Sequence, residues 1–291
     1  MATNSEELRR GEEPTIVAEI DAKLVELSGL GLRTLGGKLE ILAVGDGHRK
    51  IASADASEAT PSFVVHDSLP SAEAESQWEA ITGDATGRVF VLEESPGAVY
   101  VLDPEITSEE AKITLTLDGS EWEKGNSRGE GLVLLKNGHI LLLKEKSPTL
   151  LVELGPLGEE ASGYAPGSAV SANDVFPVPR SNERTYVILK EWAIGDSAAK
   201  VAPDASDLAV GPDGLLYVLS DKGRSISVIA ASVGPSDECF ELDATWRLPK
   251  AIAKPEGLAI LPDGRVYVAS DGPGRGQKRL FLLSKLSRAV L

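Results

Sequence analysis

The sequence is poor in the residues that carry most redox and nucleophilic chemistry. Its 291 residues include one cysteine, Cys239, and three histidines. A single cysteine excludes an intrachain disulfide, so the fold does not depend on an oxidising compartment. We expect this thiol to be buried and inert, as free cysteines usually are. We expect His139, which follows a hairpin turn, to be exposed.

Long apolar runs are also missing. No stretch approaches the ~20 apolar residues that a membrane-spanning helix needs. The polar N-terminus, from Met1 to Pro14, lacks the apolar centre of a signal peptide. We therefore predict a cytoplasmic protein with no membrane partner. We expect residues 1–13 to be a flexible segment and residues 14–291 to form one domain.

Basic residues are fewer than acidic residues. The chain has 29 basic and 45 acidic residues, which gives a formal net charge of −16. A field of this sign repels phosphate, so nucleic acid is a poor partner. Such a charge also favours solubility. We expect a small-molecule ligand, and we favour a monomer while the oligomeric state stays open.

One pattern recurs five times along the chain. Each copy starts with Ser or Glu, continues with a small residue and an aliphatic residue, and leads into two short apolar strands around a turn such as Asn137-Gly138. The copies begin at Ser28-Gly29-Leu30, Glu79-Ala80-Ile81, Glu130-Gly131-Leu132, Ser206-Asp207-Leu208 and Glu256-Gly257-Leu258. Further strand segments follow each pair, and helix signals are nearly absent. The repeats predict an all-β fold, a β-propeller.

The ends of the repeat array explain how the ring closes. The fifth copy lacks an outer strand, and residues 15–20 can supply it from the other end of the chain. Propellers close in this way. We therefore predict five four-stranded blades closed by an N-terminal strand. A Gly/Ser/Pro-rich insertion at about 155–184 interrupts the third copy, and a sixth, degenerate blade inside it is the alternative.

The spacing inside the repeat brings acidic side chains together. Glu79 and Glu94 flank their turn at equal distance, and such residues lie opposite each other in an antiparallel hairpin. First strands line the channel of a propeller, so an inner ring should converge at one end, here called the acidic mouth: Ser28, Glu79, Glu130, Ser206 and Glu256. A second ring should lie slightly further out: Asp46, Glu94, Glu145, Asp221 and Asp271.

Crowded carboxylates have three physical solutions. The first is a hard cation, and we expect Ca²⁺ at Glu79, Glu130 and Glu256, with Mg²⁺ or no metal as alternatives. The second is neutralisation by basic side chains. The third is protonation of carboxyls with a raised pKa, a signature of catalytic sites. Basic residues of the neighbouring loops include His48, Arg49, Lys146, Lys222, Arg224 and Arg275.

Two functions fit this mouth. The first is a metal-assisted hydrolase or lyase that acts on a small ester, lactone or phosphoester. Its bases would be Glu94, Glu145 or Asp271, with His48 as a further candidate. The substrate would contact Ser28, Asp46, Arg49, Trp78, Ser206, Asp221, Arg224 and Arg275, although packing is the more frequent role for a tryptophan such as Trp78. The alternative is a propeller that binds a ligand or a protein without catalysis.

The repeats resemble a known family. The segment NSRGEGLVLLKNGHILLLKEKSP resembles the third repeat of the SdiA-regulated propellers, and DASDLAVGPDGLLYVLSD and KPEGLAILPDGRVYVASD resemble the fourth and fifth. The resemblance covers about residues 24–286 and implies the propeller fold. Asp207 departs from it, because the family prefers Gly there. Esterase-like phytases share some of these words, and the more distant resemblance to gluconolactonase-like propellers implies a divalent cation in the channel.

Overall fold

The computed structural model describes residues 8–69, 76–95, 97–117, 129–146, 148–230, 232–272 and 280–287. Strands dominate these ranges. Helix is limited there to η2 (Ser181–Glu183) and α1 (Asp196–Ala199). The all-β prediction is confirmed.

The strands form five four-stranded antiparallel units. Unit 1 is β3 (Leu27–Leu35), β4 (Lys38–Gly45), β5 (Ile51–Asp55) and β6 (Val64–His66). Unit 2 is β7 (Trp78–Gly83), β8 (Val89–Glu93), β9 (Ala98–Leu102) and β10 (Glu109–Thr116). Unit 3 is β11 (Gly129–Leu134), β12 (Ile140–Lys144), β13 (Leu150–Pro156) and β14 (Thr185–Ile194). Unit 4 is β15 (Ala205–Val210), β16 (Leu216–Ser220), β17 (Ser225–Ile229) and β19 (Leu242–Arg247). Unit 5 is β20 (Pro255–Ile260), β21 (Val266–Ser270), β22 (Leu280–Leu283) and β2 (Ile16–Ile20).

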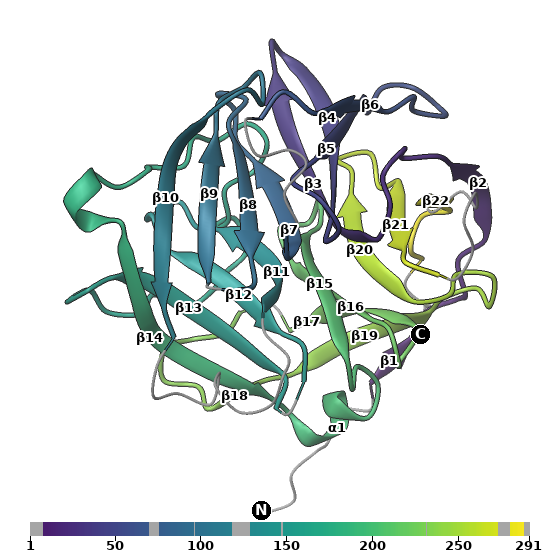
Figure 1. The fold of residues 1–291 in the computed structure, drawn as a ribbon. Coiled ribbons are helices and arrows are strands. Elements are labelled where there is room, and N and C mark those ends of the chain that lie inside the picture. The colour runs from purple at the N-terminus through teal and green to yellow at the C-terminus, as the bar shows by residue number, and fades with distance from the viewer. Residues whose placement is uncertain are drawn as a thin grey trace, which may run out of the picture.

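The units are arranged as a β-propeller. Their first strands, β3, β7, β11, β15 and β20, lie around the centre, and their last strands lie at the periphery (Figure 1). Each first strand packs against the next, and β20 packs against β3, so the ring is closed. The last unit is completed by β2, which pairs antiparallel with β22. The predicted closure by an N-terminal strand is confirmed.

Two connections join or extend the units. The outer strands β10 and β14 pair in parallel, which merges units 2 and 3 into one sheet. The short strand β1 (Arg9–Arg10), inside the segment expected to be flexible, pairs in parallel with β19 of unit 4. The insertion, fully described between β13 and β14, contains η2 and two isolated bridges but no strand. It therefore supplies no sixth strand unit.

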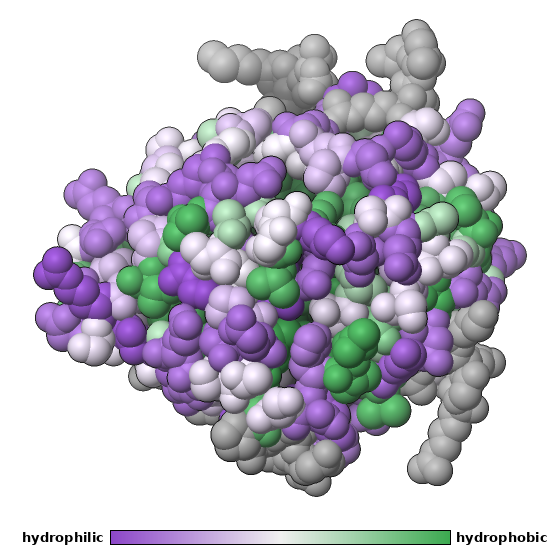
Figure 2. Space-filling model, turned by 90° about the horizontal axis from the view of Figure 1, so that it is seen from above, coloured by the Kyte–Doolittle hydropathy of each residue, from purple (hydrophilic) through white to green (hydrophobic). Residues whose placement is uncertain are grey.

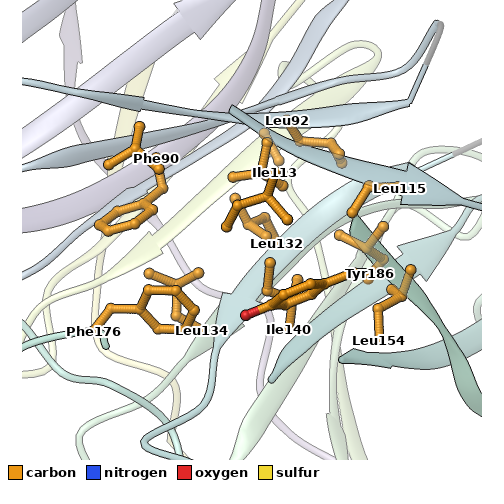
Figure 3. Packing of buried hydrophobic residues seen from close by; sticks show 14 of the residues in the cluster. Phe90, Leu92, Ile113, Leu115, Leu132, Leu134, Ile140, Leu154, Phe176 and Tyr186 are labelled. Carbon is orange, nitrogen blue, oxygen red and sulfur yellow. The ribbon is translucent and has the colours of Figure 1, made fainter. Parts of the chain in front are cut away.

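Apolar cores fill the spaces between neighbouring units. Second strands such as β8 and β12 are buried over their whole length, because a neighbouring unit covers each face. Figure 3 shows the core between units 2 and 3, where Phe176 of the insertion packs against Phe90 with ring centroids 5.3 Å apart. The insertion is therefore part of the core and not a loose loop.

Two sequence predictions about single side chains are wrong. Cys239 is exposed, because β18 (Cys239–Phe240) is a two-residue edge strand whose alternation turns Phe240 inward. His139 is buried, because the insertion folds over the hairpin turn. Its Nδ1 lies 2.6 Å from Glu153 and its Nε2 lies 2.8 Å from Glu159. These carboxylates raise the His139 pKa, with the hydrogen bond to Glu153 as the largest cause.

The outer surface is mainly hydrophilic, as the many charged residues of the sequence predict. Figure 2 shows one face on which hydrophilic residues cover most of the described surface and apolar residues form scattered groups. The described ranges contain no helix with the length and apolarity that a membrane span needs.

The close approach of first strands gives a test of the ring. A Cβ atom on Gly31 would lie 2.1 Å from the carbonyl oxygen of Ile81 in the next unit. We predict that Gly31→Ala lowers the free energy of unfolding by about 3 kcal/mol, because two backbones would have to separate. Chemical denaturation measures this. Gly234→Ala is the control, because the nearest atom to its new Cβ lies 3.3 Å away. Equal stability of the two variants would contradict this packing.

Candidate functional site

The first strand of every unit contains a β-bulge at the same place. The register shifts between Leu27 and Gly29, and again at the corresponding point of each of the other four units. The extra residues are those of the predicted inner ring: Ser28, Glu79, Glu130, Ser206 and Glu256. Bulges redirect side chains and are frequent beside active sites. Five equivalent bulges therefore direct five polar side chains toward one end of the channel.

The predicted pairing of the two rings is wrong in its register. Glu79 does not lie opposite Glu94, because the strand pairing sets Ala80 opposite Leu92 and the bulge then sets Trp78 opposite Glu93. The backbone N–H of Glu94 donates to the carbonyl of Gln77, two residues before Glu79. Asp46, Asp221 and Asp271 make the corresponding bond to Glu26, Asp204 and Lys254. The second ring is thus displaced from the first, although both occupy the same mouth.

Three glutamates of the inner ring affect one another electrostatically. Burial raises the pKa of Glu130 to about 10, with repulsion from Glu79, Glu145 and Glu256 as further causes. Burial also raises the pKa of Glu79 to about 7 and that of Glu256 to about 8. Carboxyls that titrate near neutral pH in a recess are candidates for proton transfer.

Lysines neutralise the outer part of the mouth. Lys254 contacts Asp271 and lies 3.4 Å from Glu256. Lys146 contacts Glu145 and lies 3.3 Å from Asp204. Lys222 lies 2.7 Å from Asp204. Among the described residues, no basic side chain lies within ion-pair distance of Glu79 or Glu130. The carboxyls of Glu79 and Glu130 therefore have no cation partner among these residues, and protonation is the way left to neutralise them.

The basic side chains that were predicted to contact the substrate or act as a base do not face the glutamates of the mouth in the described ranges. Arg49 lies 2.9 Å from Glu93 and stacks over the Tyr100 ring, at the contact between units 1 and 2. Arg224 donates to the carbonyl of Pro249 at 2.8 Å. His48 is exposed in the loop after β4. Arg275 lies outside the described residues.

Three uncharged candidates are partly or fully buried. Trp78 is 1% exposed and packs in the core between units 1 and 2, which is the packing role that its sequence context favoured. The Ser206 hydroxyl donates to the carbonyl of Pro255 at 2.7 Å and so links units 4 and 5. The Ser28 hydroxyl donates to the carbonyl of Glu26 at 3.2 Å, and its interaction with Glu79 acts against the rise in the Glu79 pKa. Only Ser28 among these contacts a glutamate of the ring.

Sequence reasoning missed three residues of the mouth. Asp204 and Lys254 lie two residues before the bulges of units 4 and 5, and Asp207 follows the bulge of unit 4. Asp207 is 1% exposed and accepts hydrogen bonds from the backbone N–H groups of Leu208 and Leu258, at 2.7 and 2.6 Å. The sequence did contain a signal for this residue, because Asp207 stands where the related propellers prefer Gly. Burial holds the pKa of Asp207 well above its usual range.

The donor chemistry of the mouth fits a hard cation, because Glu79, Glu130 and Glu256 supply carboxylate oxygens without nitrogen or sulfur. In the described ranges, however, no three His, Cys, Asp or Glu side chains are placed closely enough to hold one ion. Binding of one ion by all three glutamates would need their carboxyl groups to move closer together.

The family model of the SdiA-regulated proteins matches residues 62–275. The chain belongs to the SdiA-regulated family. None of the curated proteins matches this SdiA-regulated chain in sequence.

Solved structures resemble the chain in fold. Glutaminyl cyclase from Myxococcus xanthus has a TM-score of 0.55 and 13% identity, over 97% of this chain and 100% of its own. The PQQ-bound aldose sugar dehydrogenase from Streptomyces coelicolor has a TM-score of 0.54 and 12% identity, over 94% and 98%. A luciferin-regenerating enzyme has a TM-score of 0.51 and 14% identity, over 94% and 96%. At these identities the likeness shows the fold alone.

The raised pKa values predict how stability depends on pH. Because Glu130 holds its proton to about pH 10 in the folded state, against 4.5 ordinarily, the native state binds more protons between these values. Its contribution to stability is complete below about pH 4.5 and is lost as the pH rises. We predict that Glu130→Gln raises the free energy of unfolding by roughly 2 kcal/mol at about pH 9, with little change near pH 4.

Denaturation at both pH values measures this difference. Glu105→Gln, at an exposed site between β9 and β10, is the control. If Glu130→Gln behaved like this control at high pH, Glu130 would not be a buried, repelled carboxyl.

Proposed function

We propose that this SdiA-regulated protein is a hydrolase or lyase that acts on a small ester or lactone at the acidic mouth. One observation carries the proposal: equivalent bulges bring Glu79, Glu130 and Glu256 together as buried, mutually repelling carboxyls. In this proposal the five units are the blades of a five-bladed propeller, and the protein acts as a cytoplasmic monomer.

Proton transfer is assigned to Glu79 and Glu256, since their pKa values of about 7 and 8 allow both protonation states near neutral pH. In hydrolysis, one ionised glutamate removes a proton from water as the water oxygen attacks the acyl carbon. The other, protonated, gives its proton to the leaving alkoxide. In a lyase reaction, the same pair removes a proton beside a carbonyl and protonates the leaving group. Glu130 stays protonated and donates a hydrogen bond.

The charge of the mouth favours a neutral substrate. Asp46 and Asp221 add to the carboxyls at the rim, and like Glu79 and Glu256 they have a raised pKa caused mainly by burial. A phosphoester would be repelled unless a cation neutralised the ring. Glu94 acts on Glu79 and Asp271 acts on Glu256, so in this proposal they help to raise the pKa values of the proton-transfer pair, while Glu145 acts on Glu130.

A cation remains part of the proposal as an alternative to protons. Ca²⁺, or Mg²⁺ in second place, would be held by Glu79, Glu130 and Glu256 and would supply a Lewis acid for an ester or phosphoester oxygen. Carboxylates bound to a cation would be ionised, whereas the proton form keeps Glu130 neutral.

Substitution of the proton-transfer pair tests catalysis. We predict that Glu79→Gln or Glu256→Gln lowers kcat/KM for neutral esters and lactones about 100-fold or more, because Gln cannot exchange a proton. Glu130→Gln should lose only a few-fold, since the amide keeps a neutral hydrogen-bond donor. Initial rates on p-nitrophenyl esters and simple lactones, with Glu105→Gln as the control, measure this. No turnover in the wild-type protein would contradict the enzyme and favour the non-catalytic binding propeller.

Calcium titration separates the cation form from the proton form. In the cation form, Ca²⁺ raises the melting temperature by several degrees by mass action, EDTA reverses the rise, and Glu130→Gln abolishes it. In the proton form, melting temperature and rates do not respond to Ca²⁺, Mg²⁺ or EDTA. Thermal unfolding under these conditions would exclude one of the two forms.

A further inference from the structure

The central channel contains a second recess, at the end opposite the acidic mouth. Its volume is about 610 Å³, within the range of small-molecule sites. First strands of all five units line it, with Leu32, Thr82, Leu134, Val210 and Ile260 among the lining residues. Only the space at the centre of the ring can touch all five strands, so this recess is the other half of the channel.

Asp207 separates this recess from the acidic mouth. The lining begins at Leu30, Leu208 and Leu258, each two residues after a bulge residue. The layer between contains Asp207, whose carboxyl group accepts hydrogen bonds from the backbone N–H groups of Leu208 and Leu258 and also interacts with the backbone of Leu30. This buried, hydrogen-bonded carboxyl group closes the inner end, so a ligand in this recess would not reach the glutamates of the mouth.

The insertion builds the rim of the recess. The N–H of Lys136 donates to the carbonyl of Ser168, and that of Val170 donates to the carbonyl of Leu134, so residues 168–170 extend the edge of β11. At one end, the N–H of Ala85 in unit 2 donates to the carbonyl of Asp174 at 2.8 Å. At the other end, the Tyr164 hydroxyl donates to the carbonyl of Gly214 in unit 4 at 2.6 Å.

This anchoring gives the insertion a function. One long segment is hydrogen-bonded to three units and follows the wall of the recess, with Gly167, Ala169 and Ala172 among the lining residues. Long ordered loops inside compact domains are usually functional. The repeats alone would close the ring without it.

The lining defines the chemistry of a ligand. Its described walls are mainly aliphatic side chains and glycine, and these lining residues include no aromatic ring for stacking a base or a flavin. Its two charged side chains, Lys136 and Asp174, pair with each other at 3.2 Å, so neither is left for a charged ligand. Thr34, Thr82 and Asn173 add hydrogen-bonding groups. Burial of an unpaired charge is costly, which selects against ionised molecules.

We propose that this recess, rimmed by the insertion, is a second binding site for a neutral, aliphatic small molecule with hydroxyl or amide groups. It is independent of the proposed reaction at the acidic mouth, because Asp207 lies between the two.

The test is a titration of the whole chain with 1,2-octanediol, a neutral aliphatic probe, followed by methyl NMR of leucine, valine and isoleucine. We expect saturable shifts at Leu134, Val210 and Ile260. Octanoate, which has the same chain length and a charge, should bind about tenfold more weakly or worse. Equal binding of the two probes, shifts that do not saturate, or shifts confined to other methyl groups would overturn the proposal.

Variants of the insertion separate the recess from other surfaces. Ala172→Trp places a large ring in the rim and should weaken binding of the diol at least about tenfold. Val175→Trp is the matched control, since Val175 is 56% exposed and does not line the recess. Asn173→Trp serves as the second rim variant if Ala172→Trp lowers the melting temperature. Unchanged binding in the rim variants would overturn the site, whereas Glu79→Gln should leave diol binding unchanged whatever it does to turnover.

Discussion

The close approach of five first strands around one axis determines the chemistry of both ends of this molecule. At Gly29 and Gly131 a Cβ atom would lie 2.5 Å from the Glu79 carbonyl oxygen and 2.6 Å from the Leu208 nitrogen. These glycines directly follow the bulges, so the strands are nearest to one another where the glutamates leave them. The burial that raises the pKa values of Glu79, Glu130 and Glu256, and the repulsion of Glu130 by the other two, follow from this spacing.

Asp207 is the exception among the small residues that directly follow the bulges, and its side chain occupies the centre of the channel. Three of the five units have Gly at this position and one has Ala, whereas unit 4 places a carboxylate in the space that the small residues leave. Its hydrogen bonds reach β15 and β20, and it also interacts with the backbone of Leu30 in β3, on the other side of the join where the first and last parts of the ring meet. The same side chain thus stabilises the closure and divides the channel into two halves.

The two halves differ in how charge is balanced. At the acidic mouth, Lys254 has a left-handed backbone conformation, with φ at 47°, and its side chain contacts Asp271 and Glu256. Glu26, at the equivalent position of unit 1, has φ at 51°. Non-glycine residues in this conformation are strained, and such strain is common at functional sites. At the other end, the single ion pair of Lys136 and Asp174 leaves the lining neutral.

The repeats and the turn residues alone were sufficient to predict the all-β class, the ring of strand units and its closure by residues near the N-terminus. Each of these follows from local alternation and from a count of strands per copy. They also predicted that Glu79, Glu130 and Glu256 lie at one mouth, since equivalent positions of a repeat occupy equivalent places in the ring.

What the sequence could not give are the contacts between units. The bulges changed which residue opposes Glu94, because register depends on strand pairing and not on spacing alone. Arg49 forms an ion pair with Glu93 of the next unit. His139 is buried because the insertion after β13 folds over the turn between β11 and β12. Asp207 was visible only as a departure from Gly. Local pattern determined the elements and the ring, whereas packing between segments far apart in the chain decided which side chains are free to act.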